Sequence, residues 1–351
     1  EIGTGDWSSD VCSSVFRVAC AGAGYFSQFH FGSWARMDGV DVVGACDRDI
    51  ARAKATGVPA FSDLPEMLRD TTPDLLDIIL PPPAHADTVR AALAAGITWI
   101  ICQKPFCRDL DEARAITQEA EAAGTTLIIH ENFRFQPWYR AIKTQIDAGT
   151  IGTVLNATFR LRPGDGQGPR AYLDRQPYFQ QMPRFLVHET AVHWIDTFQY
   201  LFGPVDSVYA DLRRINPVIA GEDAGHVVFD HGSGVRALFD GNRLLDHAAD
   251  NTRRTMGEAL VEGTGGTLTL TGDGRVTLRA FGSSDTEEVL APDSWDGFGG
   301  DCVHALNRHV VAAMQGAGAL ENTARDYLSV IAIKDAIYAS ADAGRRIDVT
   351  G

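Results

Sequence analysis

The feature that most constrains this chain is a regular alternation between residues 16 and 130, where short apolar runs are separated by segments of helical character. Runs that are apolar at every position are typical of strands buried on both faces of a sheet. Strands that alternate with helices in this way are typical of parallel βαβ units. We therefore expect a parallel sheet covered by helices. The five expected strands span 16–21, 40–46, 74–80, 97–102 and 125–130.

Two helices carry clear end signals. One is expected over 109–124, where Asp109 can serve as the N-cap and Gly124 can stop the helix. The other is expected over 137–149, because proline is favoured at the first helical position.

After residue 152 the pattern changes to alternating apolar and polar positions, which is typical of antiparallel strands with one solvated face. Two late helical segments, at about 300–316 and 323–343, close the chain and could pack back on its first part. We therefore expect an α/β domain at 15–135 and an α+β domain at 136–351. The strands expected in the second domain span 153–162, 205–213, 226–230, 235–241, 258–263 and 267–272.

The first 14 residues, EIGTGDWSSDVCSS, differ in character from the rest of the chain. They lack the charged and apolar regions of a secretory signal, and the first Met of the chain is Met37. We expect residues 1–14 to be a non-native or disordered leader.

Composition and charge limit the binding partners and the cellular compartment that we expect. A formal net charge of −15 over 351 residues argues against nucleic acid, whose binding needs a basic face. The longest apolar tracts are far shorter than the roughly 20 residues that cross a bilayer. Six cysteines are scattered without any Cys-x-x-Cys pair, which favours a reduced, cytoplasmic protein over a disulfide or zinc framework. We expect no membrane partner and no metal.

The first candidate binding motif is GAGYFS, which follows the first expected strand and opens a helix. Gly22 and Gly24 permit a tight turn in which a pyrophosphate approaches backbone N–H groups, with Tyr25 and Phe26 in the same turn. A plain strand-to-helix turn is the alternative. Context favours a dinucleotide, because Asp47 ends the second strand where an acid binds the adenosine ribose hydroxyls.

A carboxylate at Asp47 would repel a 2′-phosphate, which favours NAD over NADP. The next residue, Arg48, could pair with that phosphate, so NADP is not excluded. The sequence predicts NAD as the cofactor.

The carboxyl ends of the later strands carry further polar residues, at the edge where open α/β sheets bind ligands. Leu80, Pro81 and Pro82 force a turn there, and His85 would begin the next helix, as a ligand or as a cap. The fourth strand ends in Gln103 and Lys104, held by a following proline.

The fifth strand leads to Asn132 and Arg134, which either bind a ligand or form a turn. Further along, the segment 163–185 has neither helical nor strand periodicity, and it includes Tyr178 and Arg184. Long irregular segments of this kind are often lids or binding loops, though they can be mobile connectors.

The stretch VHETAVHWID nearly matches a zinc-protease motif. Two zinc ligands on a helix need i,i+4 spacing, whereas His188 and His193 are five residues apart and would point about 140° away from each other. Glu189, His193 and Asp196 instead share one helical face. The stretch therefore predicts a proton-transfer cluster, with a buried structural histidine as the alternative.

Together these motifs resemble the Gfo/Idh/MocA oxidoreductases, the group of glucose–fructose oxidoreductase and inositol dehydrogenase. The resemblance rests on the order Gly-rich turn, acid after the second strand, Pro-Pro…His, Lys-Pro, Asn-x-Arg and a distant Glu-x-x-x-His-x-x-Asp. It covers the chain from about Phe16 to Val349. The usual motif in that family is Glu-Lys-Pro, and here a Gln replaces the Glu.

This resemblance implies a Rossmann dinucleotide-binding domain and a second domain with a large open, mainly antiparallel sheet. It also implies a nicotinamide cofactor, carbohydrate-like substrates and a homodimer or homotetramer. The cofactor would contact Gly22, Gly24, Tyr25, Phe26, Asp47, Arg48, Leu80, Pro81, Pro82, His85, Gln103, Lys104 and Asn132. The substrate would contact Arg134, Tyr178, Arg184 and Asp196.

In the expected reaction a hydride moves between nicotinamide and a secondary alcohol or ketone of a sugar, polyol or sugar acid. His193 would be the general base and Lys104 would hold the reacting oxygen. Glu189 would orient the imidazole or contact substrate, and Asp196 would orient the imidazole. Redox-assisted glycoside hydrolysis and a non-catalytic dinucleotide sensor or co-repressor are the alternatives.

Overall fold

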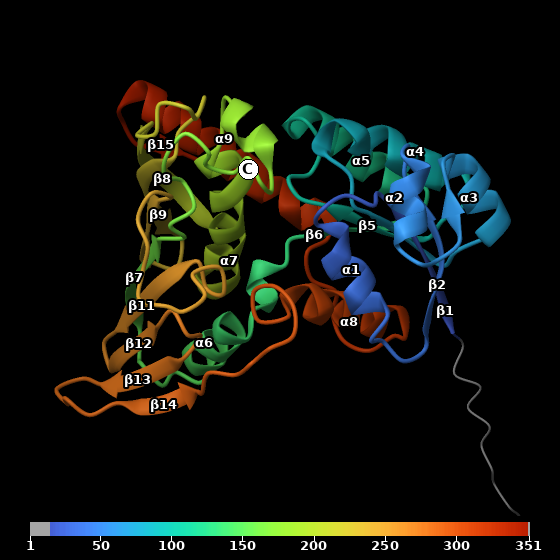
Figure 1. Cartoon of the computed structure of the whole chain (residues 1–351). Coiled ribbons are helices and arrows are strands. Elements are labelled where there is room, and N and C mark those ends of the chain that lie inside the picture. The colour runs from blue at the N-terminus through green and yellow to red at the C-terminus, as the bar shows by residue number, and fades with distance from the viewer. Residues whose placement is uncertain (1–14, 350–351) are drawn as a thin grey trace, which may run out of the picture.

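The computed structural model describes residues 15–349, arranged around two β-sheets (Figure 1). The expected leader at 1–14 lies outside the described residues. Within 15–349, no helix is long and apolar enough to cross a membrane.

The first sheet has six parallel strands in the order β3-β2-β1-β4-β5-β6. All five expected strands are present, and the apolar run at 74–80 gives a shorter strand. The strand Ala60–Phe61 was not expected, because two residues are too few to show an apolar pattern. The strands are β1 (Phe16–Ala21), β2 (Val40–Cys46), β3 (Ala60–Phe61), β4 (Leu75–Ile78), β5 (Trp99–Gln103) and β6 (Thr126–His130).

Helices cover both faces of this sheet. The N-cap prediction is confirmed, since the Asp109 carboxylate accepts a hydrogen bond from the Glu112 backbone N–H at 2.9 Å. Apolar residues of α3, α4 and α5 pack on one face, and α1 packs on the other. The helices of this part are α1 (Ser27–Trp34), α2 (Ile50–Ala55), α3 (Leu64–Thr71), α4 (His85–Ala94) and α5 (Leu110–Ala122).

The second sheet has nine strands in the order β14-β13-β12-β11-β7-β10-β9-β8-β15. Every neighbouring pair is antiparallel except β7 and β10, which run parallel near the middle. The predicted fold class is therefore confirmed. The strands are β7 (Val154–Leu161), β8 (Val205–Arg213), β9 (Ala224–His231), β10 (Arg236–Asn242), β11 (Gly257–Gly263), β12 (Gly266–Leu270), β13 (Val276–Ala280), β14 (Glu287–Leu290) and β15 (Ile347–Asp348).

Helices pack on one face of the second sheet and leave its other face open (Figure 1). Phe159 of β7 and Phe239 of β10 are fully buried beneath Trp194 of α7. The helices on this face are α6 (Pro137–Asp147), α7 (Val192–Phe202) and α9 (Ala324–Ala343). The helix expected over 137–149 thus begins where predicted and ends two residues early.

The helix α8 (Cys302–Met314) returns to the first sheet. Its residues Leu306 and Val310 are fully buried in one cluster with Val18 of β1 and Leu75 of β4. A late segment of the chain therefore completes the face of the first sheet that α1 covers only in part.

The turn after β1 depends on Gly22. Its φ of +110° lies where only glycine is unstrained, and an added Cβ would lie 2.3 Å from the Ile79 carbonyl oxygen. The turn therefore passes directly against the chain that leaves β4.

Replacing Gly22 with Ala is expected to lower the free energy of unfolding by about 1–3 kcal/mol, the cost of holding a non-glycine residue at such a φ. Gly24→Ala is the matched control, because an added Cβ there meets no atom within 4 Å. Urea denaturation of the two variants would measure the difference. Equal stability of both variants would contradict the close packing at Gly22.

Candidate active site

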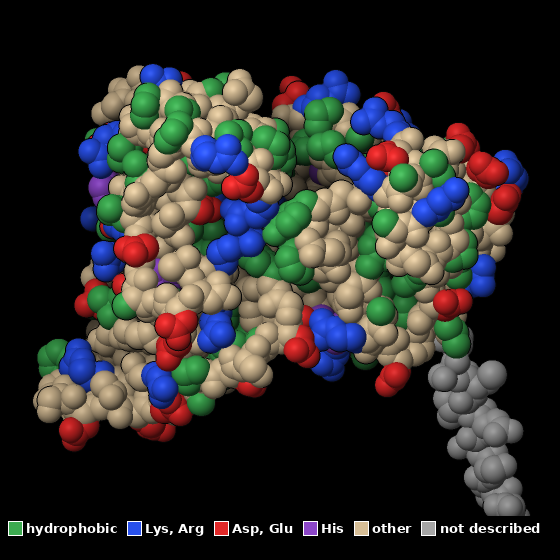
Figure 2. Space-filling view, viewed as in Figure 1, with side chains coloured by type: hydrophobic (Ala, Val, Ile, Leu, Met, Phe, Trp, Pro, Cys, Tyr) green, Lys and Arg blue, Asp and Glu red, His purple; other side chains and the backbone are tan. Residues whose placement is uncertain are grey.

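A cavity of about 480 Å³ lies between the carboxyl edge of the first sheet and the helical face of the second. The first part contributes Gly24, Pro81 and Lys104, and the second contributes Glu189 and His193. Figure 2 shows a groove between the two halves of the molecule, bordered by hydrophobic side chains and by Lys and Arg. The residues expected to react therefore meet in one cavity from both parts of the chain.

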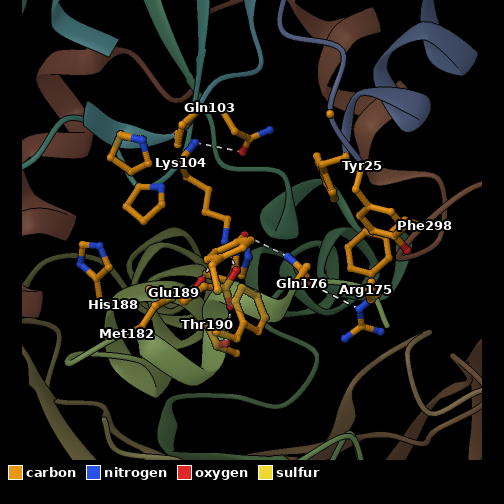
Figure 3. Close-up of a pocket in the computed structure, with 18 of the residues that line it drawn as sticks. Tyr25, Gln103, Lys104, Arg175, Gln176, Met182, His188, Glu189, Thr190 and Phe298 are labelled. Carbon is orange, nitrogen blue, oxygen red and sulfur yellow. Dashed lines mark hydrogen bonds and ion pairs between the residues drawn. The ribbon is translucent and has the colours of Figure 1, made fainter. Parts of the chain in front are cut away.

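An ion pair joins the two sides of the cavity (Figure 3). The Lys104 ammonium donates to Glu189 Oε1 at 3.0 Å and to the Glu189 carbonyl oxygen at 2.7 Å. Burial raises the pKa of Glu189, but the charges of Lys104 and Arg243 lower it to about 2. Glu189 therefore carries a negative charge and faces Lys104, although we expected it to orient the imidazole or to contact substrate.

Arg243, which the sequence did not single out, fixes the far side of this carboxylate. Its guanidinium is 2% exposed, donates to Thr190 Oγ1 at 2.5 Å and lies 3.8 Å from Glu189 Oε2. It also donates to Asp165 Oδ2 at 2.7 Å. A lone Arg following a strand gives no sequence signal of its own, so only the fold shows this contact.

The His193 imidazole is held by Glu131, a second residue that we did not predict. Glu131 is fully buried, and one of its carboxylate oxygens bonds to His193 Nδ1. The ring stacks on Phe133 with centroids 3.8 Å apart. Since Nδ1 is engaged, Nε2 is the nitrogen left for a ligand. An acid directly after an apolar strand was the available signal for Glu131.

Burial governs the charge of His193. Removal from water lowers its pKa, Glu131 opposes that shift, and the nearby Lys104 ammonium adds to it. The net direction is downward, so the imidazole is neutral near pH 7 and able to accept a proton.

The local backbone corrects the predicted helical spacing. Leu186–Ala191 forms a wider π-helical turn, and regular α-helix begins only at Val192. The 100° rotation per residue of a regular α-helix therefore does not apply before Val192. His188 lines the same cavity as His193, although we expected the two side chains to point apart. Burial, with the charges of Lys334 and Lys104, lowers the pKa of His188 to about 4.

Asp196 does not orient His193, contrary to our expectation. Its carboxylate forms a bidentate pair with Arg134, at 2.8 Å to Nε and 2.5 Å to Nη2. Neither residue lines the cavity. The pair ties the 3₁₀ turn Phe133–Phe135, which precedes α6, to α7, so each of the two side chains has a structural partner.

Two further predicted ligands lie outside the cavity. His85 is fully buried, with Nε2 on the Leu80 carbonyl at 2.8 Å and Nδ1 accepting from the Cys107 N–H at 3.3 Å. It therefore joins two loops that shape the cavity. Arg184 stacks on the ring of Tyr338 at 4.3 Å, on the outside of the same region.

The segment expected to be a lid forms one wall of the cavity. It contains the 3₁₀ turn Pro177–Gln181, and Tyr178 faces the cavity. Phe179 packs with Tyr172 and Phe185 in a small separate core. The loop is therefore anchored by its own aromatic cluster.

The remaining predicted cofactor contacts surround the cavity. Tyr25, Phe26, Leu80, Pro82, Gln103 and Asn132 all line it. Asn132 also donates to Cys302 Sγ at 3.2 Å. Gln103 does not touch the Lys104 ammonium, so the charge opposite that ammonium comes from Glu189.

The turn at the start of α1 fits a dinucleotide. Gly24 lines the cavity, and a Cβ added to it would meet no atom within 4 Å. This open space is what a pyrophosphate needs to approach the backbone. Asp47 accepts from the Ala23 and Asp49 N–H groups, both at 2.9 Å, and thus lies beside the turn. Arg48 is exposed and does not line the cavity.

Metal ligands are not clustered. Among residues 15–349, no group of three or more His, Cys, Asp or Glu side chains could hold a metal ion. The cavity presents the His193 imidazole, which can take up a proton, and the Lys104 ammonium, which can stabilise negative charge on oxygen.

Replacing Glu131 with Gln is expected to lower kcat between about 10- and 100-fold, because the imidazolium formed during proton transfer loses its counter-charge. Glu131 raises the pKa of His193, so its removal moves the acid limb of kcat/KM to lower pH. A pH–rate profile would measure this shift. The control is Asp196→Asn, whose carboxylate pairs with Arg134; an equal shift there would contradict the assignment.

Comparison with known proteins agrees with this geometry. Residues 16–131 match the family described as "Oxidoreductase family, NAD-binding Rossmann fold", and 139–269 match the "GFO/IDH/MocA C-terminal domain". D-apiose dehydrogenase of Paraburkholderia graminis is 32% identical over 346 residues, covering 95% of this chain and 90% of the relative. D-apiose dehydrogenase of Rhizobium rhizogenes is 28% identical, covering 95% and 97%.

A solved structure is also similar along its whole length. The oxidoreductase from Agrobacterium radiobacter, in complex with NAD+, L-tartaric acid and magnesium, superposes with a TM-score of 0.87. It is 26% identical, and the match covers 96% of this chain and 99% of that one. The predicted resemblance is confirmed: this chain belongs to the Gfo/Idh/MocA family of NAD-binding oxidoreductases.

Proposed function

We propose that this protein is an NAD-dependent dehydrogenase that oxidises a secondary alcohol of a small sugar or sugar acid, and reduces the ketone in the reverse direction. The observation that carries the proposal is the meeting of Lys104 and His193 in one cavity, with Glu131 behind the imidazole. The two D-apiose dehydrogenases that resemble the whole chain support a sugar substrate.

The protein's own side chains account for the movement of the proton. His193 Nε2 accepts the hydroxyl proton while Glu131 balances the positive charge that forms on the ring. The Lys104 ammonium donates a hydrogen bond to the same substrate oxygen and stabilises its developing negative charge. A bound nicotinamide supplies the chemistry of hydride acceptance.

Polar groups in the cavity suit a molecule with several hydroxyls. Arg175, Gln176 and Tyr178 line the cavity on the loop side, opposite Lys104. They offer both donors and acceptors for hydrogen bonds. D-apiose is therefore the first substrate to test, and sugar acids come second because a structural neighbour binds L-tartaric acid.

The test is a panel of pentoses including D-apiose, polyols and sugar acids, assayed for net NADH and net NADPH. We expect NADH to accumulate with at least one sugar, and Lys104→Ala and His193→Ala to lower kcat by about 10²–10⁴-fold while NADH still binds. Calorimetry gives the binding control. Glycoside cleavage without net NADH, or full turnover by both variants, would refute the proposal.

We also propose that the open face of the second sheet joins copies of this chain in a homo-oligomer. A row of neutral side chains crosses this face in register, from Tyr209 through Val228, Leu238 and Thr158 to Leu260. Tyr209 is 41% exposed and Leu260 36% exposed. Such a row costs free energy in water and gains it when covered.

Leu260→Arg is expected to shift the protein toward monomer, because it places a charge at one end of the row. The control is Phe281→Arg, at an exposed residue just after β13 that lies off the row. Sedimentation equilibrium would measure the masses. A wild-type monomer at micromolar concentration would contradict the proposal.

We propose a reducing compartment, the cytoplasm, as the location. Five cysteines of the described residues are free thiols, and all five are buried. Reduced cysteines are the norm in that compartment.

A further inference from the structure

A chain of buried polar side chains runs beneath the cavity behind Gln103. Asp77 lies in strand β4, whose other residues are all apolar, and His30 lies on α1; both are fully buried. A carboxylate in such a place is costly unless it receives hydrogen bonds. Neither residue takes part in the proton transfer described above.

The hydrogen bonds of this chain have only one consistent direction. The Lys104 backbone N–H can only donate, and it points at the Gln103 side chain at 2.9 Å, so the acceptor there is the amide oxygen. The Gln103 NH₂ group must then face His30 Nε2, which lies 3.1 Å away. Because NH₂ can only donate, His30 Nε2 carries no proton.

The other ring nitrogen of His30 carries the proton instead. With Nε2 unprotonated, His30 Nδ1 donates to Asp77 Oδ2 at 2.8 Å. The same oxygen accepts from Trp34 Nε1 at 2.8 Å. Every link from Asp77 to the Lys104 backbone therefore fits one neutral tautomer of His30.

A second titratable ring packs against His30 and does not alter this pattern. His130 of β6 lies 4.2 Å away between ring centroids. Burial lowers the pKa of His130 well below its usual value, so it is neutral. Among the described residues Asp77 is the one charged group that hydrogen-bonds to His30.

We propose that Asp77 and His30 are positioning residues, which lock the Gln103 amide so that it holds the backbone of Lys104 in place. The inference rests on the role of Lys104 in the proposed function. The amide at position 103 has two roles, since it accepts from the Lys104 N–H and donates to His30 Nε2. A carboxylate there cannot donate to His30 Nε2, so His30 would have to become charged to restore the chain.

The sharpest test is therefore Gln103→Glu, which keeps the length of the side chain and removes the NH₂ donor to His30. We expect kcat to fall by on the order of tenfold or more at pH 8, because Lys104 loses its fixed position.

Moving the carboxylate from the Nδ1 side of the His30 ring to its Nε2 side should restore kcat. In the double variant Asp77→Asn with Gln103→Glu, made in a Trp34→Phe background so that Trp34 Nε1 does not face the new NH₂ group, His30 can adopt the opposite neutral tautomer, donating from Nε2 and accepting at Nδ1 from the new amide. We expect its kcat to return to within a few-fold of that of Asp77→Asn with Trp34→Phe.

The matched control is Trp34→Phe, which removes the other donor to Asp77 Oδ2 and leaves the His30 chain intact. It should lower the melting temperature while kcat and the pH profile stay as in the wild type. A purely structural role predicts instead that kcat falls with melting temperature in all variants. That result, full activity of Gln103→Glu at every pH, or failure of the double variant to exceed it, would overturn the proposal.

Lys104→Ala, assayed in parallel, separates this inference from the proposed function. If Lys104→Ala loses activity while Gln103→Glu keeps it, only the positioning role fails. If Lys104→Ala itself retains full turnover, the role proposed for Lys104 fails, and the positioning role fails with it.

Discussion

The ion pair between Lys104 and Glu189 links the two halves of the cavity. Lys104 leaves the first sheet after β5, and Glu189 lies in the π-helical turn before α7, 85 residues later. Removing one member of a buried pair costs about 3–5 kcal/mol, since the other charge is left without a partner. Arg243 and Thr190 hold this carboxylate from behind. The second half thus fixes Lys104 of the first, and Glu131 of the first half fixes His193 of the second.

Local periodicity was enough to predict most of the elements. β8 spans the expected residues, and Asp109 caps α5 as its chemistry indicated, because both depend on neighbours in sequence. The order in which the strands of the second sheet pair was harder to predict from the sequence. The parallel pair of β7 and β10 brings together residues about 80 positions apart, and no local pattern specifies such a register.

The sequence predicted which residues form the candidate site better than it predicted which of them pair with each other. Lys104 was found because it follows a strand end, Glu189 and His193 because they are four residues apart in a recognisable motif, and all three line the cavity. Their partners depended on geometry that ideal helical spacing does not describe. The π-helical turn and the buried Glu131 assign the imidazole to a different carboxylate from the one expected, and Asp196 pairs with Arg134 instead.

The return of α8 to the first sheet has a consequence for biosynthesis. A ribosome releases β1 and β4 early, yet the cluster around Val18 and Leu75 also needs Leu306 and Val310. During most of translation that face of the nucleotide-binding half therefore has an incomplete apolar cover. The half that is made first can finish its core only when nearly the whole polypeptide has emerged.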